Sequence, residues 1–225
     1  DIGLEQARAL ARGIDIPVRP AALQKVMELQ EDSSADLNQI AEVISQDVSL
    51  SAGVLKTVNS PLYGLRNNIS SIQQAVNLLG LNNVINIVMG IALRLEICGR
   101  FTVAVERFWD TANDVAMVSA GLAKSLSCGS PDEAYTLGLF HDCGIPLMMM
   151  KYPDYVDVLK QVNQATEGCF TDLEDQTFKT NHTVVGFYVA KSWRIPTRIC
   201  AAILNHHNPA MLHGDDDAVA NLLAV

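Results

Sequence analysis

The stretch Gly138-Leu139-Phe140-His141-Asp142-Cys143-Gly144 places a histidine beside a carboxylate within an apolar segment. A carboxylate is costly to bury without a partner. Asp142 therefore requires a metal ion, a helix N-terminus or a basic side chain close to it. Imidazole and carboxylate groups are good ligands for Zn, Fe, Mn and Ni, so His141 and Asp142 are candidate metal ligands. We interpret Cys143 as a small buried apolar side chain rather than a nucleophile.

Three more histidines lie near the ends of predicted helices and can join the same site. His182 begins one helix, and the adjacent pair His206 and His207 lies near the end of another. Separate helices of a bundle can bring such ligands together in its interior. Neighbouring residues on a helix point about 100° apart, so we expect at most one of His206 and His207 to face a shared site unless the helix end is distorted. The alternative is that these histidines are surface or capping residues, which leaves no metal site.

Helical periodicity extends outward from this stretch over most of the chain. Apolar residues recur every three or four positions in two clear series, Leu37, Ile40, Ala41 and Ile44, and Ile72, Ala75, Val76 and Leu79. Ser33, three residues before Asp36, has the spacing of a capping box before the first series. Ser71 and Gln74 have the same spacing before the second series, which Gly80 ends. Alternating strand patterns are scarce, so we predict an all-α fold.

A change between two long helical patterns divides the chain. The apolar helix that begins at Leu81 ends near Gly99, and an amphipathic helix containing Trp109 follows. A chain of 225 residues is long enough for two lobes. We predict a two-lobe helical bundle, in which residues 1–13 form an N-terminal helix leading into the domain, residues 14–100 form the first lobe and residues 101–225 form the second.

The charge balance restricts the class of partner. The chain has a net charge of −9 and only 16 Lys and Arg residues, whereas binding to a nucleic-acid backbone requires clustered basic residues. We therefore expect no DNA or RNA partner. A few basic side chains are enough to hold one nucleotide, so a small phosphorylated ligand remains compatible with the composition.

Hydropathy and cysteine usage indicate the compartment. No run of about 18 uninterrupted apolar residues is present to span a bilayer, and the five cysteines lie far apart without a C-x-x-C pair. We expect a reducing, cytoplasmic location and no membrane association. The chain starts at Asp1 and stops inside an apolar run without a helix stop signal, so we expect it to be part of a longer polypeptide.

The order and spacing of these motifs resemble those of the HDOD domain, the HD-related output domain of bacterial signalling proteins. In the first half the resemblance rests on Pro17, Pro20, Ser45-Gln46-Asp47, Asn59-Ser60, Tyr63-Gly64 and Leu78-Leu79-Gly80. In the second half it rests on Trp109, residues 138–144, His182, Gly186, Trp193, Pro196 and His206-His207. Together these motifs extend from Ile14 to the C-terminus.

The resemblance implies an all-α fold whose second lobe is similar to the HD and HD-GYP phosphohydrolases. In those enzymes a histidine of the first helix, an adjacent His-Asp pair and further His and Asp residues hold divalent metals, which activate water against a phosphate ester. By position, His141 and Asp142 match the His-Asp pair, and His182 matches the next histidine. His206 or His207 matches the paired histidines. The resemblance thus implies a divalent Fe, Mn, Ni or Zn ion as cofactor, with Asp142 as the catalytic group if the protein is active.

Departures from the active relatives favour a loss of catalysis. The first-helix histidine should fall two residues after Trp109, where this chain has Thr111, and no GYP motif follows His207. A hydroxyl is a poor substitute for imidazole. We therefore predict a non-catalytic bacterial signal-transduction output module that acts through protein contacts with signalling proteins or with attached sensor or receiver domains. The alternative is a metal-dependent phosphohydrolase with an altered ligand set, acting on a phosphodiester or nucleotide.

Overall fold

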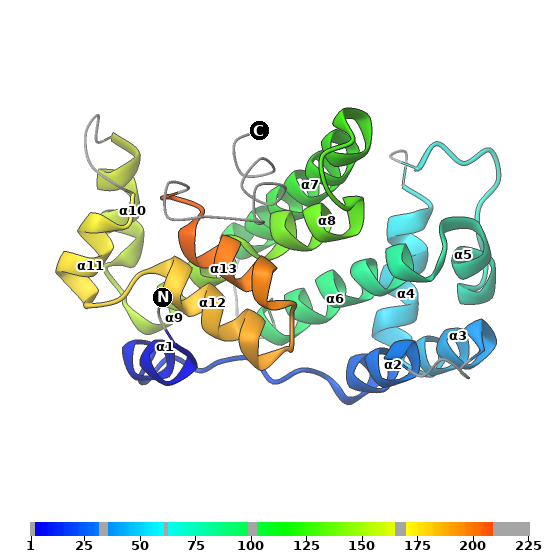
Figure 1. Ribbon diagram of the computed structural model, residues 1–225, viewed down its shortest axis with the longest axis horizontal. Helices are drawn as coiled ribbons and strands as arrows, with labels where there is room; N and C mark the ends of the chain where they lie inside the picture. Colours follow the sequence, from blue (N-terminus) through cyan, green and yellow to red (C-terminus); the bar gives the residue numbers. More distant parts are fainter. Residues whose placement is uncertain (1–2, 32–35, 61–62, 99–102, 165–169, 209–225) are drawn as a thin grey trace. The chain divides into compact units, whose positions relative to one another are not determined.

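The structure, a computed structural model, describes residues 3–31, 36–60, 63–98, 103–164 and 170–208. In these ranges every regular element is an α-helix, which confirms the predicted all-α fold (Figure 1). The helices are α1 (Leu4–Leu10), α2 (Ala21–Glu31), α3 (Leu37–Gln46), α4 (Val48–Val58), α5 (Ile72–Leu79), α6 (Leu81–Cys98), α7 (Val103–Leu126), α8 (Pro131–Phe140), α9 (Gly144–Lys151), α10 (Tyr155–Gln164), α11 (Asp172–Phe178), α12 (His182–Ser192) and α13 (Thr197–Asn205). None of these helices is long and apolar enough to cross a membrane.

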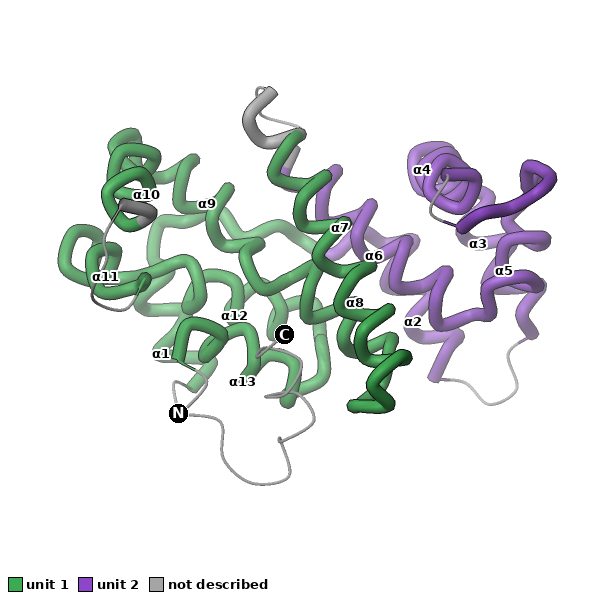
Figure 2. Tube along the Cα trace, turned by 90° about the horizontal axis from the view of Figure 1, so that it is seen from above, with its two compact units in different colours: residues 1–18, 100–225 green, residues 19–99 purple. Residues whose placement is uncertain are grey.

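The chain forms two compact units, shown in different colours in Figure 2. Unit 1 contains residues 1–18 and 100–225, and unit 2 contains residues 19–99. The expected lobes had boundaries at 13/14 and 100/101, so residues 14–18 lie in unit 1 rather than with the first lobe. They are held there because α1 packs against α12 and the indole Nε1 of Trp193 donates a hydrogen bond to the Pro17 carbonyl at 2.9 Å.

Side-chain caps begin the helices of unit 2. Asp36 is the N-cap of α3 and forms a capping box with Gln39, one turn later than the predicted pair of Ser33 and Asp36. Ser33 itself lies outside the described residues. Ser71 caps α5 as predicted, by accepting a hydrogen bond from the Gln74 backbone N–H at 3.2 Å, and Gly80 follows the helix with a φ of 81°.

Unit 1 is built around a pair of adjacent antiparallel helices, α7 and α8, and the helices α9, α12 and α13 (Figure 1). α8 begins with Pro131 in its first turn, where a missing N–H costs nothing, followed by two acidic residues that favour a helix N-terminus. Phe140, at the end of α8, packs edge-on against Trp193, and both are almost fully buried. This core fixes the end of α8 against the end of α12.

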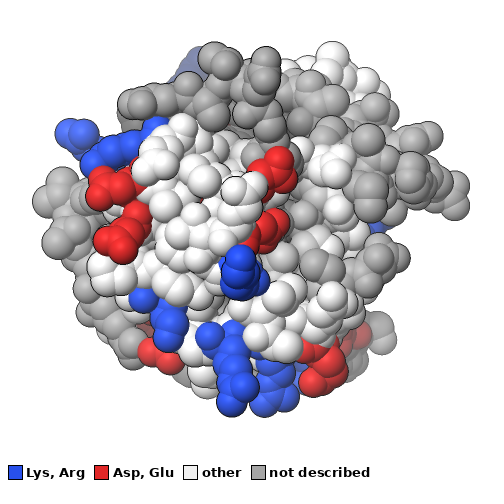
Figure 3. Space-filling view, turned by 90° about the vertical axis from the view of Figure 1, so that its left-hand side faces the viewer, with Lys and Arg blue, Asp and Glu red and all other residues white. Residues whose placement is uncertain are grey.

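Charged side chains on the face shown in Figure 3 are mixed in sign. Small groups of Lys and Arg lie beside Asp and Glu, with uncharged residues between them. The described part of this face therefore presents no continuous basic surface, which is the feature that a nucleic-acid backbone requires.

A glycine controls how closely α7 and α8 approach. A Cβ atom added to Gly138 would lie 2.8 Å from the Cα of Ala116, which is too close for real atoms. We expect Gly138→Ala to lower the free energy of unfolding by about 1–3 kcal/mol, because the backbones must separate. Gly121→Ala, on α7, is the control: an added Cβ meets nothing within 4 Å, so we expect a gain of about 0.5–1 kcal/mol. Urea denaturation of both variants measures these changes, and equal effects would contradict this account.

Candidate metal centre

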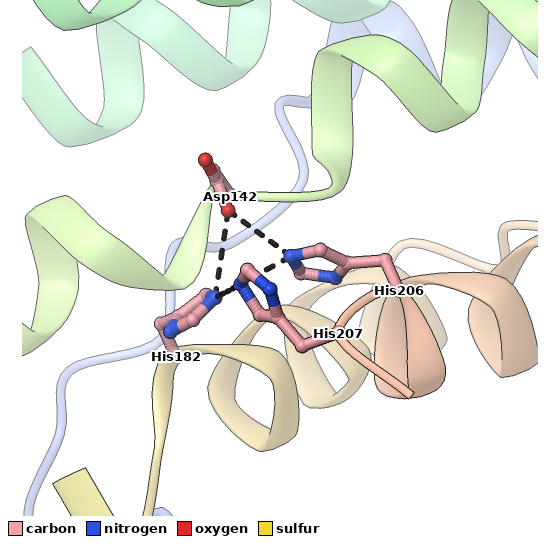
Figure 4. A group of neighbouring side chains, drawn as sticks. All are labelled: Asp142, His182, His206 and His207. Carbon is pink, nitrogen blue, oxygen red and sulfur yellow. Dashed lines mark hydrogen bonds and ion pairs between the residues drawn. The ribbon is translucent and has the colours of Figure 1, made fainter. Parts of the chain in front are cut away.

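Helix ends bring four potential ligands together. Asp142 lies in the short turn between α8 and α9, and His182 is the first residue of α12. His206 and His207 follow directly after α13 (Figure 4). One ligand atom from each of the four residues lies within 4.8 Å of all the others. This spacing is suitable for side chains that bind a single ion.

Two local features place Asp142 and His182 next to each other. Gly144 lies so close to the backbone carbonyl of His182 that a Cβ atom there would overlap it, so only glycine permits this contact between α9 and α12. The start of α12 is set by Asn181, whose side chain accepts a hydrogen bond from the Val184 N–H at 3.0 Å. The glycine after the His-Asp pair therefore has a structural role in the site.

Both His206 and His207 face the cluster, although at most one was expected from a regular helix. The 100° spacing of neighbours on a regular helix does not apply to them. α13 ends at Asn205, and the two histidines lie in the turn beyond it. The turn is closed by a hydrogen bond of 2.7 Å from the Asn208 N–H to the Asn205 carbonyl. His206 Nε2 is 3.3 Å from Asp142 Oδ1, and His207 Nε2 is 3.0 Å from His182 Nε2.

The rings of His182 and His206 each form a hydrogen bond through Nδ1, on the side away from the cluster. These bonds determine which ring nitrogen faces the other ligands. His182 Nδ1 is 2.7 Å from Glu174 Oε2, and His206 Nδ1 is 2.8 Å from the Ile203 carbonyl. Because both partners are acceptors, each Nδ1 carries a proton, and in the neutral form of the ring each Nε2 presents a lone pair. The two Nε2 atoms are 3.4 Å apart and lie 3.3–3.5 Å from Asp142 Oδ1.

The centre of the cluster thus brings three acceptor atoms together, with His207 Nε2 3.0 Å from one of them, His182 Nε2. Asp142 Oδ1 is buried and forms no hydrogen bond with the described residues. Three acceptor atoms facing one another repel, and a cation between them removes the repulsion. Imidazole and carboxylate are ligands that Zn, Fe, Mn and Ni accept, so the residues fit a divalent transition-metal ion.

Glu174 and Tyr155 form a buried layer behind His182. Glu174 is fully buried on α11, and its Oε2 accepts hydrogen bonds from both Nδ1 and the backbone N–H of His182. The Tyr155 hydroxyl donates to the other oxygen. A carboxylate behind a ligating histidine fixes the ring and its tautomer. The sequence contains no signal for this role, because Glu174 lies among acidic residues that are typical of a solvated helix N-terminus.

His141 lies beside the cluster rather than in it. Its Nε2 is 3.2 Å from Asp142 Oδ2, the oxygen that is not shared with the other histidines, and its Nδ1 is 2.7 Å from the Gly138 carbonyl. Burial lowers the pKa of His141, but the Asp142 carboxylate outweighs this effect and the net pKa is raised. With acceptors at both nitrogens, His141 is suited to donate a proton to Asp142. Its assignment as a metal ligand stays a prediction.

Charge states near neutral pH agree with metal binding. Burial raises the pKa of Asp142, but the imidazoles of His141 and His206 outweigh it and hold the pKa well below its ordinary value. Burial lowers the pKa of His207 to about 3, and the neighbouring His206 and His182 rings act in the same direction. The carboxylate is therefore ionised and His207 is neutral, which are the forms that bind metals.

Thr111 is exposed on α7 and does not belong to the four-residue cluster. Its side chain lines a cavity whose wall also includes His141 and His206. The position expected to carry a first-helix histidine therefore lines the same cavity as two histidines of the site.

Removing the negative charge of Glu174, which lies behind the His182 ring, tests whether Glu174 supports this metal ligand. Glu174→Gln keeps the volume of the side chain but weakens the hydrogen bond that fixes the ring, so we expect metal affinity to fall about 10- to 100-fold. Competition with a chromophoric chelator measures the affinity. Asp172→Asn, an exposed carboxylate on the same helix, is the matched control and should bind metal as the wild type does. Equal affinity in a folded Glu174→Gln protein would show that Glu174 does not support the ligand.

Comparison with known proteins identifies relatives of the whole domain. An uncharacterized protein of Treponema pallidum is 27% identical over 200 residues, which cover 86% of this chain and 38% of that protein. The chain therefore spans well under half the length of this relative. A solved HDOD domain protein with unknown function from Geobacter sulfurreducens is 27% identical, with a TM-score of 0.79 over 98% of this chain and 75% of that chain.

A second solved structure, from Shewanella amazonensis, is described as a candidate phosphohydrolase. It is 24% identical and has a TM-score of 0.79 over 99% of this chain and 79% of that chain, a likeness that shows the fold. The sequence pattern of the HDOD domain matches residues 16–209. This match covers most of the chain, which therefore belongs to the HDOD domain family.

Proposed function

We propose that this chain is a metal-binding regulatory output module of a bacterial signalling system, which acts through contacts with other proteins and does not hydrolyse phosphate esters. The observation that carries the proposal is the convergence of one ligand atom each from Asp142, His182, His206 and His207 within 4.8 Å of one another, around a buried Asp142 oxygen that forms no hydrogen bond with the described residues. Membership of the HDOD family supports the regulatory role. The partners proposed are sensor or receiver domains, either attached to the chain or separate, within the cytoplasm.

A divalent Fe, Mn, Ni or Zn ion would be held by Asp142, His182, His206 and His207. When bound, the ion supplies positive charge at the point where the acceptors converge. The residues of this chain provide the link to signalling, because the ligands come from three separate places in unit 1: the turn between α8 and α9, the start of α12 and the end of α13. Occupancy of the site would stabilise this arrangement of helix ends and the surface that they form.

Thr111 supports a non-catalytic role. In the HD phosphohydrolases that the sequence resembles, a metal-binding histidine occupies this position on the first helix. Here the side chain is an exposed hydroxyl, which is a poor substitute for imidazole as a metal ligand. The mixed charges in Figure 3 and the net charge of −9 support protein partners rather than DNA or RNA.

The second candidate is a metal-dependent phosphohydrolase that acts on a phosphodiester or nucleotide. The observation that favours it is the cavity of about 440 Å³ beside the ligands, because two of its lining residues, His141 and His206, belong to or contact the cluster. Cavities of this size accept small molecules. In this case Asp142 would hold the ion that activates water.

Metal content and turnover distinguish the two candidates. We expect protein purified without chelator to contain a stoichiometric metal, which Asp142→Asn removes because the ion loses its charged ligand. The metal should also raise the melting temperature of the wild type but not of the variant. Asp157→Asn is the control, since this carboxylate is exposed and does not belong to the cluster. Elemental analysis and thermal denaturation measure these effects.

Turnover of bis(4-nitrophenyl) phosphate and of cyclic dinucleotides, with Mn, Fe or Ni added, should stay at the rate in buffer. Metal-dependent turnover that Asp142→Asn abolishes would reject the non-catalytic role and establish the phosphohydrolase. Wild-type protein that contains no metal and gains no stability from added ions would reject the metal centre.

A further inference from the structure

A cavity of about 440 Å³ lies along α7 and α8, next to the candidate metal centre. The two helices run antiparallel and meet at the close contact between Gly138 and Ala116 (Figure 1). The volume is within the range of about 300–1,000 Å³ that small-molecule sites occupy. All of its lining residues belong to unit 1, so the cavity is a property of this unit alone.

Most of the cavity wall is apolar. α7 contributes Val115, Val118 and Leu122, which recur at helical spacing, and α8 contributes Ala134 and Leu137. Val118 is 60% exposed, which leaves apolar surface of the cavity wall in contact with water. An apolar ligand would remove this surface from water, which is the main favourable contribution to its binding.

Apart from Ser119 in the middle of α7, the polar side chains of the cavity gather at one end. The antiparallel contact at Gly138 places His141, at the end of α8, near the N-terminal half of α7, where Thr111 lines the same wall. His206, a member of the metal cluster, completes this end. Ala134 and Cys128 lie toward the opposite end, because α8 begins next to the end of α7. The cavity is therefore amphipathic along its length.

We propose that this cavity binds an anion with an unbranched aliphatic chain, with the chain between α7 and α8 and the anionic head at His141, His206 and the metal centre. The position of the head rests on the proposed function, because an ion held by one carboxylate and three neutral imidazoles carries a net positive charge. The shared chemistry is an anionic head on an alkyl chain, and the head is a carboxylate or a phosphate.

An aromatic nucleobase suits the cavity less well than an alkyl chain. The long section of the wall offers aliphatic side chains and no aromatic ring among its described lining residues, whereas base recognition commonly uses stacking on aromatic rings. Asp114 is the acidic side chain of the wall, and it is exposed, so water screens its charge from the head group.

The test titrates the metal-loaded chain with octanoate and with octyl phosphate by calorimetry. Octanol lacks the anion, acetate lacks the chain, and adenosine monophosphate carries an aromatic base in place of the alkyl chain. We expect octanoate or octyl phosphate to bind at least about tenfold more tightly than octanol, acetate or adenosine monophosphate. The tighter of the two identifies the head group.

A matched pair of variants on α7 locates the site. Val118→Trp fills the cavity from an exposed position and should weaken binding of octanoate and octyl phosphate about tenfold or more. Leu126→Trp adds the same ring on the same helix at a residue that is 58% exposed and does not line the cavity, so binding should be unchanged. Cys128 provides a second readout, because occupancy of the cavity should slow its alkylation by iodoacetamide, as measured by mass spectrometry.

Three results would overturn the proposal: equal binding by both tryptophan variants, tighter binding of adenosine monophosphate, or no binding of either alkyl anion. Metal content, measured on the same samples, reports separately on the proposed function. Metal-free protein that still binds octanoate in a manner that Val118→Trp abolishes would support the cavity and reject the metal centre. Metal-loaded protein that binds neither anion would reject the cavity and leave the metal centre intact.

Discussion

The contact between Gly144 and the backbone carbonyl of His182 is the constraint on which the rest of the site depends. It allows the turn that carries Asp142 to lie directly against the start of α12. Gly186, one turn further along α12, extends the contact: a Cβ atom there would lie 3.5 Å from the Cys143 Sγ and 3.2 Å from Ile203. Burial raises the pKa of the Cys143 thiol, which therefore acts as a small packing group between the helices.

Polar groups in the site are arranged in two layers that differ in how fully they are satisfied. In the rear layer, Glu174 accepts hydrogen bonds from Tyr155 and His182, and all three side chains are buried. In the front layer, Asp142 Oδ1 forms no hydrogen bond with the described residues, and the Nε2 atoms of His182 and His206 lie 3.4 Å apart. The rear layer therefore has its hydrogen bonds satisfied, whereas the front layer contains a buried acceptor without a partner among the described residues. This combination is typical of a ligand site whose ligands are held in place by residues behind them.

Much of the fold could be predicted from the sequence because it is encoded locally. The helical series after residues 36 and 71, the stop at Gly80 and the histidine at the start of α12 depend only on neighbours in the chain. The exact cap of α3 was missed because both Ser33 and Asp36 are good caps, and the side chain that pairs with Asp36 is Gln39. Residues 14–18 join unit 1 through a bond to Trp193, a contact across most of the chain that no local pattern reports.

The candidate site was predictable in its residues but less so in its geometry. The His-Asp pair and the later histidines could be assigned by resemblance, because their order along the chain is a property of the sequence. That both His206 and His207 face the cluster depends on where α13 ends, and helix ends are the least certain part of such predictions. The burial of Glu174 depends on tertiary packing, and its acidic neighbours conceal it.

The ligands come from a turn and from two helix ends that are far apart in the sequence, so a bound ion would act as a cross-link. It would close one loop that contains α9, α10 and α11 and a second that contains α12 and α13. Closing loops removes conformational entropy from the unfolded chain, as a disulfide does, but a metal link can be made and broken by the supply of ions. The stability of this whole half of the molecule would then follow the availability of one metal, and the segment from α9 to α11 would lose this cross-link when the metal is withdrawn.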